Sequence, residues 1–381
     1  MAVTPEDRRF MAAAIRLSRR HTGLTATNPS VGCLIVRDGV ILGSAVTARG
    51  GRPHAETQAL ELAGQRARGA TAYVTLEPCS HYGRTPPCAN ALVAAGIARV
   101  VVCLTDPDPR VSGRGLTILR DAGIEVVSGV LEEEGRQALE AYLMRQMKGR
   151  PHVTLKLAVS ADGMIGRVDA GQVAITGPVS RAQVHALRAE MDAILVGIGT
   201  AIADDPELTV RLPGLEDRSP VRIVLDRHLR LPLSSKLVRT AGDVPVVVVA
   251  PLSAAHASEV FAPGVSISDE DLALRRQALT ATGVEILDAA DLPDLLTQLA
   301  TRGLSSLLVE GGASVARAFL DAGLVDRILL FEGETMIGEG GIESPLTAHD
   351  IPKDYKPVRR MRFGADSCCD YEREFECLRV S

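Results

Sequence analysis

The chain of 381 residues contains no tryptophan, and its aromatic residues amount to only 3% of the total. Proteins that bind single-stranded nucleic acid stack bases on aromatic side chains along a basic channel. The formal net charge is −5, and the two signs are interspersed without an extended basic stripe. The composition therefore argues against nucleic-acid binding as the main task and favours a small-molecule substrate.

Long apolar runs are also missing. No stretch reaches the roughly 18 uninterrupted apolar residues of a membrane-spanning helix, and residues 1–10 carry charges in place of the apolar core of a leader peptide. Seven cysteines are an odd number in a chain too long for a disulfide scaffold. We therefore expect a cytoplasmic protein without a membrane span, in which Cys33 and Cys103 are core residues.

The length predicts two domains, and apolar runs that alternate with helical patterns indicate an α/β architecture. Gly149 and Pro151 end a charged helical run over 131–148, and an apolar run over 153–159 follows. We therefore expect domains over 1–148 and 151–381.

Periodicity places the expected elements. In the first part we expect helices over 11–20, 55–66, 89–95, 113–122 and 131–148, and strands over 31–36, 39–46, 72–76 and 100–104. In the second part we expect strands over 153–159, 193–196, 221–225, 244–249 and 307–309, and helices over 180–190 and 313–322. The alanine-rich stretch 254–290 shows no clear pattern.

The strongest chemical signal is the set His54, Cys79 and Cys88. Two thiolates and one imidazole make three zinc ligands, and three protein ligands leave the fourth tetrahedral position open, as catalytic sites require. Zinc lowers the pKa of a coordinated water to about 7, which provides a nucleophile at neutral pH. Glu56 then serves as the proton shuttle, because a carboxylate beside the metal can act as general base and acid.

Each of these residues alone would more often be an ordinary buried side chain. Their placement favours the metal, since Cys79 follows an apolar run and Cys88 opens a helical one. Zinc deaminases acting on bases carry H-x-E with P-C-x-x-C, whereas residues 80–87 separate the thiols here and predict a loop that walls the substrate. A structural zinc would need a fourth ligand, for which His81 is the nearby candidate. Positions two apart on a helix diverge by about 200°, so His54 and Glu56 converge only if the metal lies off the first turn.

The second part carries softer signals. In Glu310-Gly311-Gly312 an apolar run meets a glycine pair before a helix, which would leave free amides for a phosphate or make a plain turn. Thr200 closes a Gly-Ile-Gly-Thr stretch that lacks the full dinucleotide fingerprint. Asp204 with Arg211 offers a carboxylate and a guanidinium, or a solvated loop.

Several motifs together resemble the bifunctional deaminase/reductase family of riboflavin biosynthesis. In the first part these are residues 54–56, 75–81, 83–88 and 106–109, with Asn28-Pro29 upstream. In the second part they are residues 156–163, 187–188, 196–200, 203–206, 208–209, 222–226 and 309–312. The resemblance therefore covers nearly the whole chain.

The resemblance implies an N-terminal cytidine-deaminase-like three-layer α/β/α domain and a C-terminal dihydrofolate-reductase-like α/β domain. The first would use Zn²⁺ to deaminate a diamino-hydroxy-phosphoribosylamino-pyrimidine, and the second would use NADPH to reduce the ribosyl chain to ribityl. The expected partner is this phosphorylated pyrimidine, without nucleic acid or membrane. We also expect a homo-oligomer.

The resemblance also implies residue roles. The deaminase substrate would be held by Asn28, His81, Arg84 and Asp106, with Arg84 on its phosphate. The reductase substrate would be positioned by Lys156, Gln172, Arg188, Asp204, Leu208, Arg211 and Glu310. The cofactor would be lined by Ala158, Ala174, Thr200, Gly311 and Gly312.

The chain departs from the family pattern at two of these positions. The family usually has tryptophan where Ala174 stands and serine where Gln172 stands. A deaminase with a degenerate or repurposed reductase half is therefore one alternative. A nucleic-acid base deaminase is another, which the scarcity of aromatic residues opposes.

Overall fold

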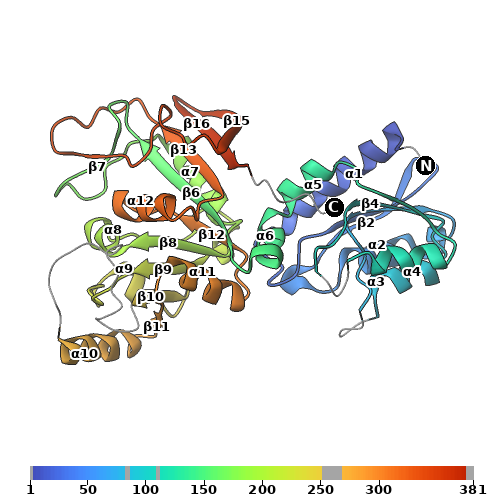
Figure 1. Ribbon diagram of the computed structural model, residues 1–381, viewed down its shortest axis with the longest axis horizontal. Helices are drawn as coiled ribbons and strands as arrows, with labels where there is room; N and C mark the ends of the chain where they lie inside the picture. The colour runs from blue at the N-terminus through green and yellow to red at the C-terminus, as the bar shows by residue number, and fades with distance from the viewer. Residues whose placement is uncertain (1–2, 82–85, 109–111, 251–267, 375–381) are drawn as a thin grey trace. The chain divides into compact units, whose positions relative to one another are not determined.

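The computed structural model describes residues 3–81, 86–108, 112–250 and 268–374 (Figure 1). The chain divides into two compact units, Met1–Arg150 and Pro151–Ser381. No helix among the described residues combines the length and apolar character that crossing a membrane requires.

The first unit is built on one mixed sheet in the order β2-β1-β3-β4-β5. Strand β1 is antiparallel to β2 and β3, whereas β3, β4 and β5 are mutually parallel. The strands are β1 (Gly32–Arg37), β2 (Val40–Val46), β3 (Thr71–Leu76), β4 (Arg99–Leu104) and β5 (Glu125–Ser128). The predicted hairpin, turning at Asp38 and Gly39, is confirmed.

Helices cover both faces of this sheet. Two glycines show how closely they pack, since a Cβ on Gly32 would lie 2.1 Å from the Ala14 carbonyl oxygen, and one on Gly43 would lie 2.1 Å from that of Ala59. One face carries α1 (Pro5–Ser18) and α5 (Glu132–Ala138); the other carries α2 (Ala55–Ala63), α3 (Cys88–Ala94) and α4 (Arg114–Asp121) (Figure 1). Helix α6 (Glu140–Lys148) and the 3₁₀ turns η1 (Arg19–His21), η2 (Arg49–Gly51) and η3 (Gly64–Ala67) complete the unit. The predicted three layers are confirmed.

Two predicted helix bounds in this unit were wrong. Helix α1 begins at Pro5, six residues before the predicted start, because Thr4 and Asp7 form a reciprocal capping box. The predicted helix 131–148 is two helices, because Leu139 leaves the helical region at φ −115° and ψ 12°. Strand β5 was missed.

The second unit contains a nine-stranded sheet in the order β11-β10-β9-β8-β12-β6-β13-β16-β15. Its strands are β6 (His152–Val159), β8 (Ala193–Gly197), β9 (Val221–Leu225), β10 (Val246–Ala250), β11 (Glu285–Asp288), β12 (Ser306–Val309), β13 (Arg327–Glu332), β15 (Tyr355–Phe363) and β16 (Asp366–Arg373). The first seven strands in sheet order are mutually parallel. Strand β16 is antiparallel to both of its neighbours, β13 and β15. A separate ribbon pairs β7 (Met164–Arg167) with β14 (Gly341–Glu343).

Successive residues on the parallel strands pack into two different hydrophobic cores, because their side chains alternate between the two faces of the sheet. Leu195 belongs to one core with α11 (Leu292–Thr301) and α12 (Ala313–Asp321). Ile194 belongs to the other, with α8 (Ile198–Asp204), α9 (Lys236–Arg239) and α10 (Asp269–Thr280). Helix α7 (Pro178–Arg188) and the 3₁₀ turn η4 (Glu216–Arg218) lie between strands in the sequence. The expected strands of this unit are present, whereas α8, α9, α10, α11, β7, β11, β13, β14, β15 and β16 were not predicted.

Candidate active sites

The first candidate site begins where α2 begins. His54 is the residue before the helix, with extended backbone at φ −70° and ψ 161°, whereas Glu56 lies in the first turn. Because His54 lies outside the helix, the angle of about 200° between positions two apart on a helix does not apply to His54 and Glu56.

Cys79 and Cys88 complete this cluster from two other elements. Cys79 follows β3 by three residues, and Cys88 is the first residue of α3, from where its amide donates to the Cys79 Sγ at 3.3 Å. His54 Nδ1 lies 3.7 Å from the Cys79 Sγ and 3.4 Å from the Cys88 Sγ. All three ligand atoms lie within 4.8 Å of one another.

This donor set fits zinc, which takes thiolate sulfur and imidazole nitrogen in a tetrahedral arrangement. Among the residues that the structure describes, His81 does not join the group, so the cluster offers three protein ligands. The arrangement is that of a catalytic rather than a closed structural site.

The cluster also shifts the ionisation of its members. Hydrogen bonds from Cys88 and then His54 outweigh burial and lower the pKa of the Cys79 thiol to about 4. Burial raises the pKa of the Glu56 carboxyl to about 7, and the neighbouring His54 opposes this rise. Glu56 is only 3% exposed and interacts with the Cys88 thiol. A carboxyl group thus lies beside the ligands without being one of them.

The segment that carries Cys79 is anchored by Glu77. This buried carboxylate accepts hydrogen bonds from the amides of Gly113 at 3.0 Å and Gly115 at 2.9 Å, and more distant ones from Asp106 and Leu116. A Cβ on Gly115 would lie 2.0 Å from the Pro78 carbonyl oxygen. The start of α4 therefore packs directly against the residue before Cys79. The motif signalled Glu77, but its partners lie far along the chain.

Three of the four predicted substrate residues of the first unit lie among the described residues. Asn28 lies against Gly51, where an added Cβ would be 2.3 Å from the Asn28 Nδ2. Asp106 is buried after β4 and accepts from the Tyr142 hydroxyl at 3.0 Å; burial raises the pKa of its carboxyl to about 6. The Nδ1 of His81 is buried and has no hydrogen-bond partner among the described residues. Arg84 lies outside the described residues.

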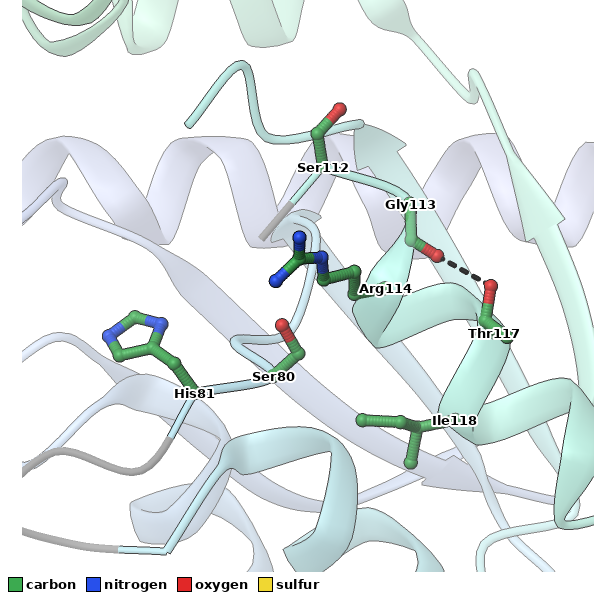
Figure 2. Close-up of a pocket in the computed structure, with 7 residues that line it drawn as sticks. All are labelled: Ser80, His81, Ser112, Gly113, Arg114, Thr117 and Ile118. Carbon is green, nitrogen blue, oxygen red and sulfur yellow. Dashed lines mark hydrogen bonds between the residues drawn. The ribbon is translucent and has the colours of Figure 1, made fainter. Parts of the chain in front are cut away.

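A pocket adjoins this segment. Its volume is about 560 Å³, which is in the usual range for small-ligand sites. Its described lining residues are Ser80, His81, Ser112, Gly113, Arg114, Thr117 and Ile118 (Figure 2). Ser80 directly follows Cys79, so the pocket opens next to a predicted zinc ligand.

The second unit holds another cluster of charged side chains. Arg188 at the end of α7 makes a bidentate ion pair with Glu310, which follows β12, at 2.8 and 3.0 Å. These side chains are 12% and 10% exposed. Lys156 lies on the neighbouring strand β6, where burial lowers the pKa of its amine and the charge of Glu310 opposes that fall. Three predicted residues are therefore brought together.

A loop from 205 to 211 borders this cluster. The Thr209 carbonyl accepts from Arg188 at 3.3 Å and lies 3.1 Å from the His185 Nδ1. His185 was not predicted, although it precedes Arg188 by three residues on one helix and so shares its face. The side chain of Arg211 pairs instead with Glu207 at 3.0 Å.

The predicted phosphate-binding turn lies next to the ion pair. The Gly312 amide donates to the Thr200 hydroxyl at 3.1 Å. A Cβ on Gly311 would lie 2.8 Å from the Val315 Cβ, so residue 311 must lack a side chain for the backbone to turn this closely into α12. Such a side-chain-free turn at the start of a helix fits the pyrophosphate of a dinucleotide. Ala158, paired with Phe331 across β6 and β13, is partly exposed.

The other predicted residues lie differently. Gln172 and Ala174 are exposed in the segment before α7. Asp204 ends α8, and burial raises the pKa of its carboxyl. The Leu208 side chain is 4% exposed and packs in the core at a left-handed φ of 56°, which leaves its backbone as the part a substrate could contact.

Comparisons with known proteins cover both units. Residues 4–104 match the cytidine and deoxycytidylate deaminase zinc-binding region, and residues 151–368 match the RibD C-terminal domain. The riboflavin biosynthesis protein RibD of Aquifex aeolicus is 40% identical over 356 residues, covering 93% of this chain and 94% of that protein.

Two solved structures match over 97% of this chain and 99% of their own. RibD of Acinetobacter baumannii has a TM-score of 0.83 at 35% identity. The diaminohydroxyphosphoribosylaminopyrimidine deaminase/5-amino-6-(5-phosphoribosylamino)uracil reductase of Thermotoga maritima has a TM-score of 0.81 at 33% identity.

These matches confirm the predicted fold class and favour the two-activity enzyme over both alternatives, the deaminase with a degenerate second half and the nucleic-acid base deaminase. The chain belongs to the RibD family of riboflavin-biosynthesis enzymes, which join a zinc-binding deaminase region to an NADPH-using reductase domain.

Proposed function

We propose that the first unit, with its domain over 1–148, removes the 2-amino group of 2,5-diamino-6-(5-phosphoribosylamino)pyrimidin-4(3H)-one as ammonia. The observation that carries this proposal is the approach of three ligand atoms to within 4.8 Å beside the buried Glu56. The Thermotoga maritima relative is a deaminase for a compound of this class.

His54, Cys79 and Cys88 would hold zinc, which supplies when bound a Lewis acid that activates water at neutral pH. Glu56 would take one proton from the attacking water on a carboxylate oxygen and deliver it to a ring nitrogen. It would then carry the second proton, from the hydroxyl now bonded to carbon, to the departing amine. Its position next to the ligands suits this transfer. Asn28, His81 and Asp106 hold the pyrimidine or ribose, and Arg84 pairs with the phosphate.

We propose further that the second unit, with its domain over 151–381, reduces the ribosyl chain of the deaminated product to ribityl. NADPH, when bound, would supply the hydride, and the protein would supply orientation and charge. Lys156, Arg188 and Glu310 position the substrate, because they form one charged cluster of which two members are an ion pair. The remaining substrate contacts are proposed at Gln172, Asp204, Leu208 and Arg211.

The cofactor would lie across Gly311 and Gly312 at the start of α12, next to Thr200. Ala158 and Ala174 complete this surface. Since Ala174 and Gln172 are exposed, their small or uncharged side chains leave the ion pair of Arg188 and Glu310 intact. We also propose a cytoplasmic homo-oligomer that binds neither nucleic acid nor membrane.

Two separate assays on the purified full-length chain test both activities. Ammonia release is measured with the phosphoribosylamino-pyrimidine, and NADPH oxidation is measured with its deaminated product. We expect both. Ammonia release without NADPH oxidation would contradict the proposal for the second unit, and the reverse would contradict the proposal for the first.

A further inference from the structure

The pocket beside the first site contains a cation without a role so far. Arg114 is the first residue of α4, and Figure 2 shows its guanidinium reaching toward the side of the pocket where Ser80 and His81 lie. The side chain is exposed, and it has no hydrogen bond or ion pair among the residues that the structure describes. Its charge is therefore available to a ligand.

The position of Arg114 is fixed relative to the zinc ligands. The next residue, Gly115, packs on Pro78 so closely that even a Cβ would lie 2.0 Å from the Pro78 carbonyl oxygen. The Glu77 carboxylate holds the amides on both sides of Arg114, those of Gly113 and Gly115. Because Cys79 follows Pro78 directly, the backbone at Arg114 packs against the segment that carries a predicted zinc ligand.

The pocket favours an anion. None of its described lining residues is acidic, whereas Arg114 brings a full positive charge and His81 a buried nitrogen without a partner. The Glu77 carboxylate already accepts hydrogen bonds from the backbone amides of Gly113, Gly115 and Leu116 at the start of α4. The guanidinium of Arg114 is therefore the main donor that the pocket offers to an anion.

We propose that Arg114 binds the 5-phosphate of the deaminase substrate and gives the first site its preference for the phosphorylated compound. The inference rests on the proposed deamination, whose substrate carries a phosphate on the ribose. A guanidinium offers a planar pair of donors that matches two phosphate oxygens. The assignment stands on Arg114 and does not depend on Arg84.

The test compares two substrates, the phosphorylated pyrimidine and the same compound after removal of its phosphate. For Arg114→Gln we expect kcat/KM of ammonia release from the phosphorylated compound to fall about 10- to 100-fold, mainly through KM, because a charge-assisted hydrogen bond is lost. Turnover of the dephosphorylated compound and zinc content should stay unchanged. Arg120→Gln, at an exposed arginine of the same helix outside the pocket, is the matched control and should change neither.

An equal fall in kcat/KM with both substrates would mean that Arg114 has a structural role, and it would overturn the proposal. An unchanged kcat/KM with both substrates would also overturn it. The comparison can also be made without turnover, by calorimetric binding of both compounds in a Glu56→Ala background. If the unaltered chain released no ammonia, the proposed deamination would fail, while the binding comparison would still decide whether Arg114 contacts the phosphate.

Discussion

The carboxylate of Asp7 on α1 accepts two hydrogen bonds from the guanidinium of Arg99 on β4, and one of them is 3.0 Å long. Asp7 is completely buried, and it also accepts from the Tyr73 hydroxyl at 3.1 Å. Burial alone would raise the pKa of its carboxyl, but the bonds from Arg99 and the Thr4 cap hold it well below its usual range. One side chain thus joins a helix start to two strands.

We expect Asp7→Asn to lower the free energy of unfolding of the first unit by about 1–3 kcal/mol, because it removes a buried carboxylate from the guanidinium of Arg99, which keeps only its second partner, Glu125. Hydrogen exchange of the β3 and β4 amides measures the loss. Glu6→Gln, at the exposed neighbour, should leave exchange unchanged. Equal protection in both variants would contradict the role given to Asp7.

The same carboxyl predicts a pH dependence. A group whose pKa is depressed in the folded protein stabilises it above the unfolded value, which is about 3.9 for aspartate, and loses that contribution as the pH falls toward the folded value. The stability difference between the unaltered chain and Asp7→Asn should therefore narrow below about pH 4. A difference that stayed constant down to pH 2 would contradict this.

Glu56→Ala should keep its zinc, because Glu56 is not among the three ligand atoms. Ammonia release should fall by about 10²- to 10⁴-fold, the usual contribution of a positioned general acid/base. Zinc is measured by elemental analysis, and NADPH oxidation serves as the internal control. Full turnover in this variant would exclude Glu56 as the proton carrier.

Cys79→Ser should lose zinc, because one of three protein ligands is replaced by a much weaker one. Cys103→Ala is the matched control, because it removes a thiol from the same unit. Cys103 is fully buried but lies outside the cluster. We expect the control to keep its zinc. A fully loaded Cys79→Ser protein would show that the ligand set is wrong.

Gly115→Ala should disturb the zinc-bearing segment, because the new methyl carbon would lie 2.0 Å from the Pro78 carbonyl oxygen. Backbone must move, which typically costs about 1–3 kcal/mol, and ammonia release should fall with it. Gly242→Ala adds a methyl group where no atom lies within 4 Å and should have no effect. Unchanged activity in Gly115→Ala would mean that α4 can shift away without consequence.

Glu310→Gln should abolish most NADPH oxidation and leave ammonia release intact. The substitution removes the charge that balances Arg188, whose side chain is only 12% exposed. The exposed pair of Arg211 and Glu207 provides a comparison, because Glu207→Gln breaks a solvated contact worth little. A reductase equally active in both variants would contradict the importance of the buried pair.

The zinc cluster could be predicted from the sequence because its signal is local. His54 directly precedes α2 and Cys88 is the first residue of α3, where short-range patterns are informative, and their imidazole and thiol chemistry is distinctive. The doubt about the angle between His54 and Glu56 disappears because the histidine precedes the helix. Cys33 and Cys103 are buried, as predicted.

The features that escaped prediction depend on distant partners. Glu77 finds its amides 29 to 39 residues away, and Arg188 meets Glu310 122 residues away. Neither pairing produces a periodic pattern in the sequence from which it could be predicted. Strand β15 was missed because it is largely exposed and lacks a continuous apolar run. Strand β13 does contain a buried apolar run, over 328–331, which was not predicted although it is a local signal.

The separation into two compact units means that the two candidate sites draw on different stretches of the chain. The described candidates for the first site lie between Asn28 and Arg114, and those for the second lie between Lys156 and Gly312. A chain disabled at Glu56 would then keep the reductase activity, and a chain disabled at Glu310 would keep the deaminase activity. Produced in one cell, two such defective alleles would together restore riboflavin synthesis that neither supports alone.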